Sequence, residues 1–290
     1  MPTRPKGSGT AFGFLRTSNQ VKEVIISDAR THLEKSIELN PDYTEAHFQL
    51  ALLLKEQGEL KKAQKHFRKV VELDENHIGG HYQLALLLHE KKDYENARTY
   101  YQRTIELGPH DADAHYHFAL FLEEQEEYIE AKNLLQKTTD IDQNYTKAYY
   151  HLARLLTDPD DYNSAKQNYQ MAVDFDQDFA EAHYYLGKLL AGGRRTNEDG
   201  TMINEPEYEL ALEHFRKTIE INQDHYKAHF NMGKILVKEK EYASAKEHLL
   251  KAIEISPDYA KAHYHLALLL IELGKLIPEQ PKRTEEAPKS

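Results

Sequence analysis

Histidine is the residue of this sequence best suited to metal binding and proton transfer, and there are 17 among its 290 residues. His115 and His117 illustrate one recurring spacing. Side chains two residues apart on a helix diverge by roughly 200°, so these two could not hold the same ion. A second set recurs at a nearly constant interval: His47, His81, His115, His183, His229 and His263.

Neighbours in this second set would lie on helices about 10 Å apart. Zinc binds nitrogen at roughly 2 Å, so no two of these histidines could share an ion. We therefore predict no metal site. Each histidine is expected to be half-buried and packed on the preceding structural unit, with a pH-sensitive seam as the alternative.

Motifs of the common enzyme classes are missing. His89-Glu90 begins a phrase typical of zinc proteases, but Asp93 ends it without a second histidine. Glu123 and Glu124 are adjacent, so on a helix they would point to different sides instead of converging for acid–base catalysis. The sequence has no cysteine, and hence no thiol nucleophile or thiolate metal ligand. We predict that the protein is not an enzyme and uses no cofactor.

A repeated phrase organises most of the chain. Ala46–Ala51 (AHFQLA) returns almost unchanged at Gly80–Ala85 (GHYQLA). Five further copies follow, and they begin at Ala114, Ala148, Ala182, Ala228 and Ala262. The first five copies start 34 residues apart, the next step is 46 residues, and the last is 34 again. One unit therefore carries a 12-residue insertion.

This pattern resembles the tetratricopeptide repeat (TPR) family, whose unit is a 34-residue helix–turn–helix with large and small residues at fixed places. One departure is the histidine at position 4, where the family has Trp or Tyr. The resemblance covers residues 21–275 and implies an all-α fold, a right-handed α-solenoid with the first helix of each hairpin, helix A, on the inner surface. Six full repeats begin at Thr44, Ile78, Ala112, Thr146, Ala180 and Tyr226.

The family binds peptides along the inner face of its helices A, and two positions of that face are distinctive here. Position 5 is always aromatic: Phe48, Tyr82, Tyr116, Tyr150, Tyr184, Phe230 and Tyr264. Position 6 always carries a hydrogen-bonding group: Gln49, Gln83, His117, His151, Tyr185, Asn231 and His265. We expect the rings either to cover apolar side chains of a ligand or to pack between adjacent helices.

Charge on this face changes between the two halves of the array. Position 9 is Leu52, Leu86 and Leu120 in the first half and Arg154, Lys188 and Lys234 in the second. Further acids belong to the first half: Glu45, Glu56, Glu90, Asp113 and Glu124. Further lysines belong to the second: Lys147, Lys227, Lys238 and Lys261, with Glu181 as an exception. Position 9 of the last helix A is Leu268. We predict a groove for a protein segment of opposite polarity, acidic where it meets the second half.

One well-known use of the family is disfavoured. Co-chaperones of this family clamp the C-terminal Glu-Glu-Val-Asp of heat-shock chaperones with Lys at position 5 and Asn at position 9. Position 5 is never Lys here and position 9 is never Asn. Chaperone tails are therefore not the expected partner.

The array ends in half-units. Residues 21–39 match a second helix, helix B, alone, and residues 260–275 match a helix A alone. The last helix would leave Leu266, Ala267, Leu270 and Leu273 uncovered. Because exposed leucines are unfavourable, we predict that a partner, the chain's own tail or another copy covers this end face.

Three segments lie outside the repeat pattern. Residues 1–20 are predicted to be a flexible basic arm, and residues 276–290 a proline-rich tail. The insertion, about residues 191–207, is expected to be a solvated loop or a partner contact, removable with little loss of stability.

Composition narrows the class of partner. The net charge of −11 disfavours nucleic acid, and no apolar run is long enough to span a membrane. We expect a cytoplasmic protein, with mitochondrial targeting by the basic arm left open. The favoured function is a non-catalytic scaffold that binds a protein segment within a larger complex. A component that self-assembles end to end and a regulatory or substrate-presenting subunit of a separate enzyme are the alternatives.

Overall fold

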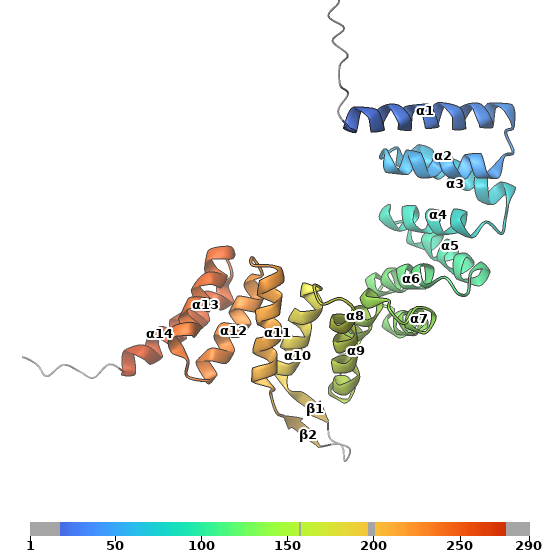
Figure 1. Ribbon diagram of the computed structural model, residues 1–290. Helices are drawn as coiled ribbons and strands as arrows, with labels where there is room; N and C mark the ends of the chain where they lie inside the picture. Colours follow the sequence, from blue (N-terminus) through green and yellow to red (C-terminus); the bar gives the residue numbers. More distant parts are fainter. Residues whose placement is uncertain (1–17, 157, 197–200, 277–290) are drawn as a thin grey trace, which may run out of the picture. The chain divides into compact units, whose positions relative to one another are not determined.

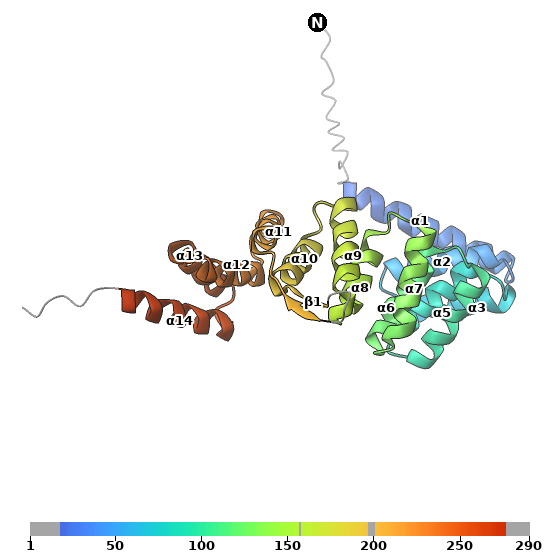
Figure 2. The same ribbon diagram turned by 90° about the horizontal axis from the view of Figure 1, so that it is seen from below.

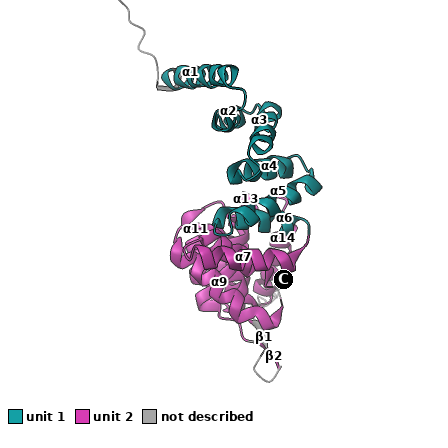
Figure 3. Cartoon of the chain, turned by 90° about the vertical axis from the view of Figure 1, so that its right-hand side faces the viewer, with its two compact units in different colours: residues 1–125 teal, residues 126–290 magenta. Residues whose placement is uncertain are grey.

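The computed structural model describes residues 18–156, 158–196 and 201–276 of the chain. It divides into two compact units, Met1–Gln125 and Glu126–Ser290, which are described separately (Figure 3). The predicted basic arm and tail fall almost entirely outside the described residues. Where they are described, Ser18–Gln20 belong to the first helix and Leu276 ends the last.

Within the described residues both units are stacks of antiparallel helical hairpins (Figure 1). The helices of unit 1 are α1 (Ser18–Leu39), α2 (Thr44–Glu56), α3 (Leu60–Leu73), α4 (Ile78–Glu90), α5 (Tyr94–Leu107) and α6 (Ala112–Glu124). Those of unit 2 are α7 (Tyr128–Ile141), α8 (Thr146–Leu155), α9 (Tyr162–Phe175), α10 (Ala180–Gly192), α11 (Tyr208–Ile221), α12 (Tyr226–Lys238), α13 (Tyr242–Ile255) and α14 (Ala260–Leu276). The all-α solenoid fold predicted by the repeat is confirmed.

Small residues set how closely the two helices of a hairpin approach. Ala85 of α4 and Ala97 of α5 are fully buried. Gly187 of α10 is so close to α11 that an added Cβ would lie 3.0 Å from the ring of Phe215. The equivalent atom on Gly233 would lie 2.8 Å from Leu249. Larger side chains at these positions would therefore push the hairpins apart.

The first helix of the fourth repeat is shorter than its counterparts. Helix α8 has 10 residues, whereas α10 and α12 have 13 each. Proline disfavours a helical conformation in the residue before it, and Asp158, before Pro159, is extended with φ −74° and ψ 148°. The chain consequently leaves the helix after Leu155 and makes the 3₁₀ turn η1 (Pro159–Asp161) before α9.

The insertion is more ordered than the sequence suggested. Strands β1 (Arg194–Thr196) and β2 (Met202–Asn204) form an antiparallel hairpin in which Arg194 pairs with Asn204. Residues 197–200 lie outside the described part. Strand β1 lies against η1 and α9 (Figure 2). The described part of the insertion is therefore a β-hairpin and not an irregular loop.

An ion pair also holds the end of the insertion to the preceding repeat. Glu207 accepts hydrogen bonds from Tyr162 at 3.0 Å and from Lys166 Nζ at 2.8 Å, both on α9. Because these contacts and those of β1 would be lost, removal of the insertion is now expected to cost stability.

Three hairpins are joined internally by a histidine pair. The two Nδ1 atoms are 2.9 Å apart in one pair and 3.0 Å in the others: His47–His66, His183–His214 and His229–His248. The first member of each pair is at position 4. Because Nε2 of His47 donates to the carbonyl of Pro41 at 2.9 Å, its Nδ1 accepts the proton of His66.

The partner histidine, on helix B of the same hairpin, is absent from the sequence-based prediction. The second repeat lacks this partner histidine. His81 donates to the carbonyl of Glu75, but Tyr100 replaces the partner histidine. Nδ1 of His81 is then buried with no hydrogen-bond partner among the described residues.

The histidine pairs predict an acid-labile fold. Burial lowers the pKa of His66, His214 and His248 below the ordinary value of 6.5. The unfolded chain therefore binds more protons below about pH 6.5, so their contribution to stability is complete above that pH and is lost as the pH falls. The thermal midpoint should be flat from about pH 8 to 7 and fall below 6.5.

The control replaces these three histidines by Gln, which should flatten the pH dependence. His32→Gln changes an exposed histidine of α1 and should leave the pH dependence of the thermal midpoint as in the wild type. Identical pH profiles for all three proteins would show that the pairs do not couple to folding.

Candidate functional site

The aromatic rings at position 5 are mostly interior. Tyr116 and Phe230 are 5 % exposed, and Tyr150 and Tyr184 are 8 % exposed. Phe48 and Tyr82 are half-buried. The expectation that these rings cover a ligand's side chains is therefore corrected for the buried ones. They belong to the contacts between repeats.

Four of the position-5 rings pack on an aromatic residue at position 34, just before the next helix A. The ring centroids are 4.6–5.1 Å apart in four boundaries: Phe48–His77, Tyr150–Phe179, Tyr184–His225 and Phe230–Tyr259. Tyr264 has no repeat after it within the described chain and is 61 % exposed. Tyr264 also lacks a helix B of its own hairpin there, whereas Phe48, Tyr150 and Tyr184 contact rings of their own helix B. Helix B and the segment before the next helix A thus bury the position-5 ring together.

Position 6 covers the same rings from the inner face. His117 lies 6.0 Å from the ring of Tyr82 in the preceding repeat, and His265 lies 5.3 Å from Phe230. Other members bond within the array. Gln83 accepts from Lys55 at 2.7 Å, and Asn231 donates to the carbonyl of Lys227 at 2.9 Å. Part of the hydrogen-bonding capacity predicted for a ligand is thus used by the fold.

The remaining position-6 side chains have nearby partners of their own. Gln49 donates to Glu45 one turn earlier in α2. His151 packs edge-on against Tyr150, with the centroids 5.1 Å apart. Leu52, Leu86 and Leu120 at position 9 of unit 1 are half-buried.

The cations at position 9 form the accessible part of the predicted site in unit 2. Arg154 and Lys188 are exposed, and Lys234 is half-buried. Each lies 5.5–5.6 Å from the centroid of an aromatic ring on its own helix: Arg154 on Tyr150, Lys188 on Tyr185 and Lys234 on Phe230. Stacking on a ring orients a cation.

Lysines gather around the last of these cations. Burial lowers the pKa of Lys234, and the nearby charges of Lys238 and Lys261 lower it further. Lys227 is also exposed, 5.7 Å from the ring of Tyr226. Like charges held this close repel one another, so a carboxylate placed among them would be stabilised.

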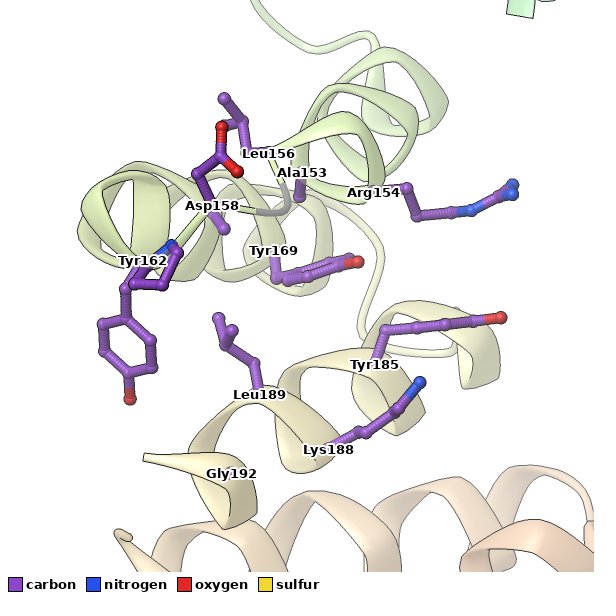
Figure 4. Close-up of a pocket in the computed structure, with 12 residues that line it drawn as sticks. Ala153, Arg154, Leu156, Asp158, Tyr162, Tyr169, Tyr185, Lys188, Leu189 and Gly192 are labelled. Carbon is purple, nitrogen blue, oxygen red and sulfur yellow. The ribbon is translucent and has the colours of Figure 1, made fainter. Parts of the chain in front are cut away.

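A pocket of about 600 Å³ opens between α8, α9 and α10 (Figure 4). Its interior is lined mainly by carbon, from Ala153, Leu156, Pro159 and Leu189. The rings of Tyr169 and Tyr185 are stacked against each other, 6.2 Å apart and inclined by 13°. Figure 4 shows their hydroxyls pointing to the same side as Arg154 and Lys188. Burial raises the pKa of Tyr169, so its phenol remains a neutral hydrogen-bonding group.

The end face of α14 is only partly open. Ala267 and Leu270 are exposed, the latter at 46 %. Leu266 and Leu273 are half-buried against the core of unit 2, because they face α13. A stripe that the sequence analysis did not assign to the end face is also exposed: Tyr264, Leu268 and Ile271, at 61, 44 and 57 %.

Two other kinds of site are not found among the described residues. No three histidine, aspartate or glutamate side chains there converge on a position for a metal ion. In that same part of the chain, every helix is too short or too polar to traverse a lipid bilayer.

Family comparisons agree with the geometry. Models of the tetratricopeptide repeat match residues 88–156, 146–179 and 233–274, and a model of anaphase-promoting complex (cyclosome) subunit 3 matches residues 26–104. The chain belongs to the tetratricopeptide repeat family. Among curated protein sequences none matches this TPR protein.

Solved structures share the TPR fold at low sequence identity. The C-terminal part of a TPR protein from Cytophaga hutchinsonii is 13% identical with a TM-score of 0.64, covering 84% of this chain and 96% of that one. PilF of Pseudomonas aeruginosa is 17% identical with a TM-score of 0.63, covering 84% and 99%. The Cut9–Hcn1 structure is 14% identical with a TM-score of 0.58, covering 84% and 46%. At these identities the likeness shows the fold alone.

Three departures from the regular TPR unit meet at the pocket. The short α8 leaves the space that a full helix A would fill, and η1 forms one wall. The insertion places β1 against η1. The change from leucine to a cation at position 9 begins with Arg154, on the rim. Pro159, three residues before the second helix of its repeat, was the sequence signal that could have revealed the pocket.

The position-5 contacts predict unequal effects of the same substitution. Phe230→Ala removes a ring that is 5 % exposed and should cost about 3–5 kcal/mol of unfolding free energy. Tyr264→Ala removes a ring that is 61 % exposed and should change it by no more than about 0.5 kcal/mol. Urea denaturation followed by circular dichroism measures both. Equal losses would contradict the conclusion that helix B and the segment before the next helix A bury the ring.

Proposed function

We propose that this TPR protein is a non-catalytic scaffold, and that the basic face of unit 2 binds an acidic segment of another protein. The face consists of Arg154 on α8, Lys188 on α10 and Lys234 on α12, together with the lysines around the last. The observation that carries the proposal is the stacking of each of these cations on an aromatic ring of its own helix.

The fixed orientation of these three cations favours a role in binding over a role in solubility alone. A free lysine loses much rotamer freedom when it is immobilised by a ligand, whereas a side chain already stacked on a ring loses less. The mutual repulsion of Lys234, Lys238 and Lys261 adds a driving force, because an incoming carboxylate relieves it. The chain as a whole has a net charge of −11, so this local concentration of positive charge differs in sign from the rest of the protein.

The family context supports a role in assemblies. The similar Cut9–Hcn1 structure is described as a hetero-tetramer of the APC/C, and the first repeats here match the model of an anaphase-promoting complex subunit. We extend to this chain only the general role, a subunit that holds other proteins. Catalysis plays no part in the proposal.

Charge reversal tests the basic face. Arg154→Glu, Lys188→Glu and Lys234→Glu together should reduce retention of partner proteins on the immobilised chain at least about 10-fold, and the remaining binding should depend less on salt. Quantitative pull-down across a salt series measures both.

A matched control reverses three exposed cations of helices B, namely Lys137, Arg216 and Lys246. It changes the net charge equally and should leave retention unchanged. If both triple variants lose partners to the same extent, net charge and not this face determines binding.

The exposed stripe of α14 favours a second function, end-to-end assembly. Tyr264, Leu268 and Ile271 follow helical spacing and would be covered by a further helix. In unit 1, α1 is the complementary half-unit, a second helix with no first helix before it in the described chain. We propose that α14 of one copy meets α1 of another, a head-to-tail contact.

Light scattering over a concentration series tests this assembly. The wild type should grow in mass with concentration, and Leu268→Glu with Ile271→Glu should abolish the growth because two charges would be buried in the contact. Leu210→Glu with Leu250→Glu, at exposed leucines of α11 and α13, is the control. A wild type of constant monomer mass contradicts the second function.

A further inference from the structure

We infer that the pocket between α8, α9 and α10 is an anchor for one bulky apolar side chain of the acidic segment. This inference rests on the proposed function and adds its specificity determinant. It assigns to the ligand a hydrophobic residue followed by carboxylates at a defined spacing.

The interior of the pocket suits an apolar side chain. Its volume of about 600 Å³ is within the usual range for ligand pockets, roughly 300–1,000 Å³. Leu156, Pro159 and Leu189 are only half-buried, so their carbon surface is available for a ligand to cover. Regular TPR units of this chain have a 13-residue helix A here, and so the space is particular to the fourth repeat.

The rim fixes the direction of the ligand. Arg154 and Lys188 extend to one side of the pocket, and Asp158 lies on the other (Figure 4). A carboxylate next to the anchored side chain would be attracted to the two cations and repelled by Asp158. An acidic segment should therefore leave the pocket toward α10 and α12.

The spacing of the helices sets the spacing of the acids. Neighbouring helices A lie about 10 Å apart, and an extended chain advances about 3.3 Å per residue. Cations at position 9 of α8, α10 and α12 would then meet a carboxylate about every third residue. A helical ligand would need roughly seven residues for the same distance, at 1.5 Å per residue.

A designed peptide tests the anchor directly. The probe is a fluorescein-labelled Phe-Glu-Gly-Ser-Glu-Gly-Ser-Glu, titrated with the full chain and followed by fluorescence anisotropy. We expect binding that weakens at least about 10-fold when Phe is replaced by Gly in the peptide. Leu189→Gln in the protein should weaken it to a similar extent, and so should Leu156→Gln. Circular dichroism checks that each variant is folded.

The matched control is Leu210→Gln, the same change at a leucine of α11 that is 44 % exposed outside the pocket. It should bind the probe like the wild type. No binding at about 1 mM protein overturns the inference. Equal affinity for N-acetylphenylalanine amide overturns it as well, because the pocket would then be a small-molecule site. A peptide with its acids two residues apart that binds as well as the probe overturns the extended register.

Separate variants distinguish the inference from the proposed function. If Lys234→Glu weakens binding of the probe but Leu189→Gln and the Gly peptide do not, the proposed basic face is supported and the anchor is overturned. If Leu189→Gln weakens binding of the probe and Lys234→Glu does not, the proposed basic face is contradicted, and so is the acidic extension of the ligand.

Discussion

The aromatic contact between position 5 of one repeat and position 34 before the next is the interaction on which the stacking depends at four boundaries. A single hairpin cannot bury its own apolar face, so neighbouring repeats must do it. At Phe230 the contact is complete, because the ring packs against Tyr259 and His265. At Tyr264, the same repeat position, no repeat follows in the described chain and the contact is not made. Stability in this architecture is consequently a property of boundaries between repeats.

The buried rings also explain why the basic face can exist. A cation at position 9 needs a support that does not move, and Tyr150 and Phe230 are held in place by the next repeat. The ring thus has two roles, since it seals one boundary and supports Arg154 or Lys234 one turn later. Packing and recognition depend on the same side chains, although only the cations are accessible.

The fold could be predicted from sequence because its determinants are local and repeated. Helices α2, α4, α6, α8, α10 and α12 begin at the residues where the repeated phrase places them. The burial of position 5 was harder to predict, since the enclosing residue is 29 positions further on, as with Phe48 and His77. The histidine pairs were missed for a similar reason. Position 4 was compared between repeats, whereas His66 is in the same repeat as His47.

The pocket could not be predicted from the repeat because it arises where the repeat is broken. The repeat period predicts a full-length α8, but Pro159 favours an extended conformation at Asp158, and the helix ends early.

The place of the pocket in the middle of unit 2 also has a consequence for dynamics. Helices in a stack open most readily at its ends, and among the described residues α14 has a neighbouring hairpin on one side only. Helices α8–α10 have packed neighbours on both sides within unit 2, so α14 can open while the pocket keeps its shape. Amide hydrogen exchange would register this difference as fast exchange in α14 and slow exchange around the pocket.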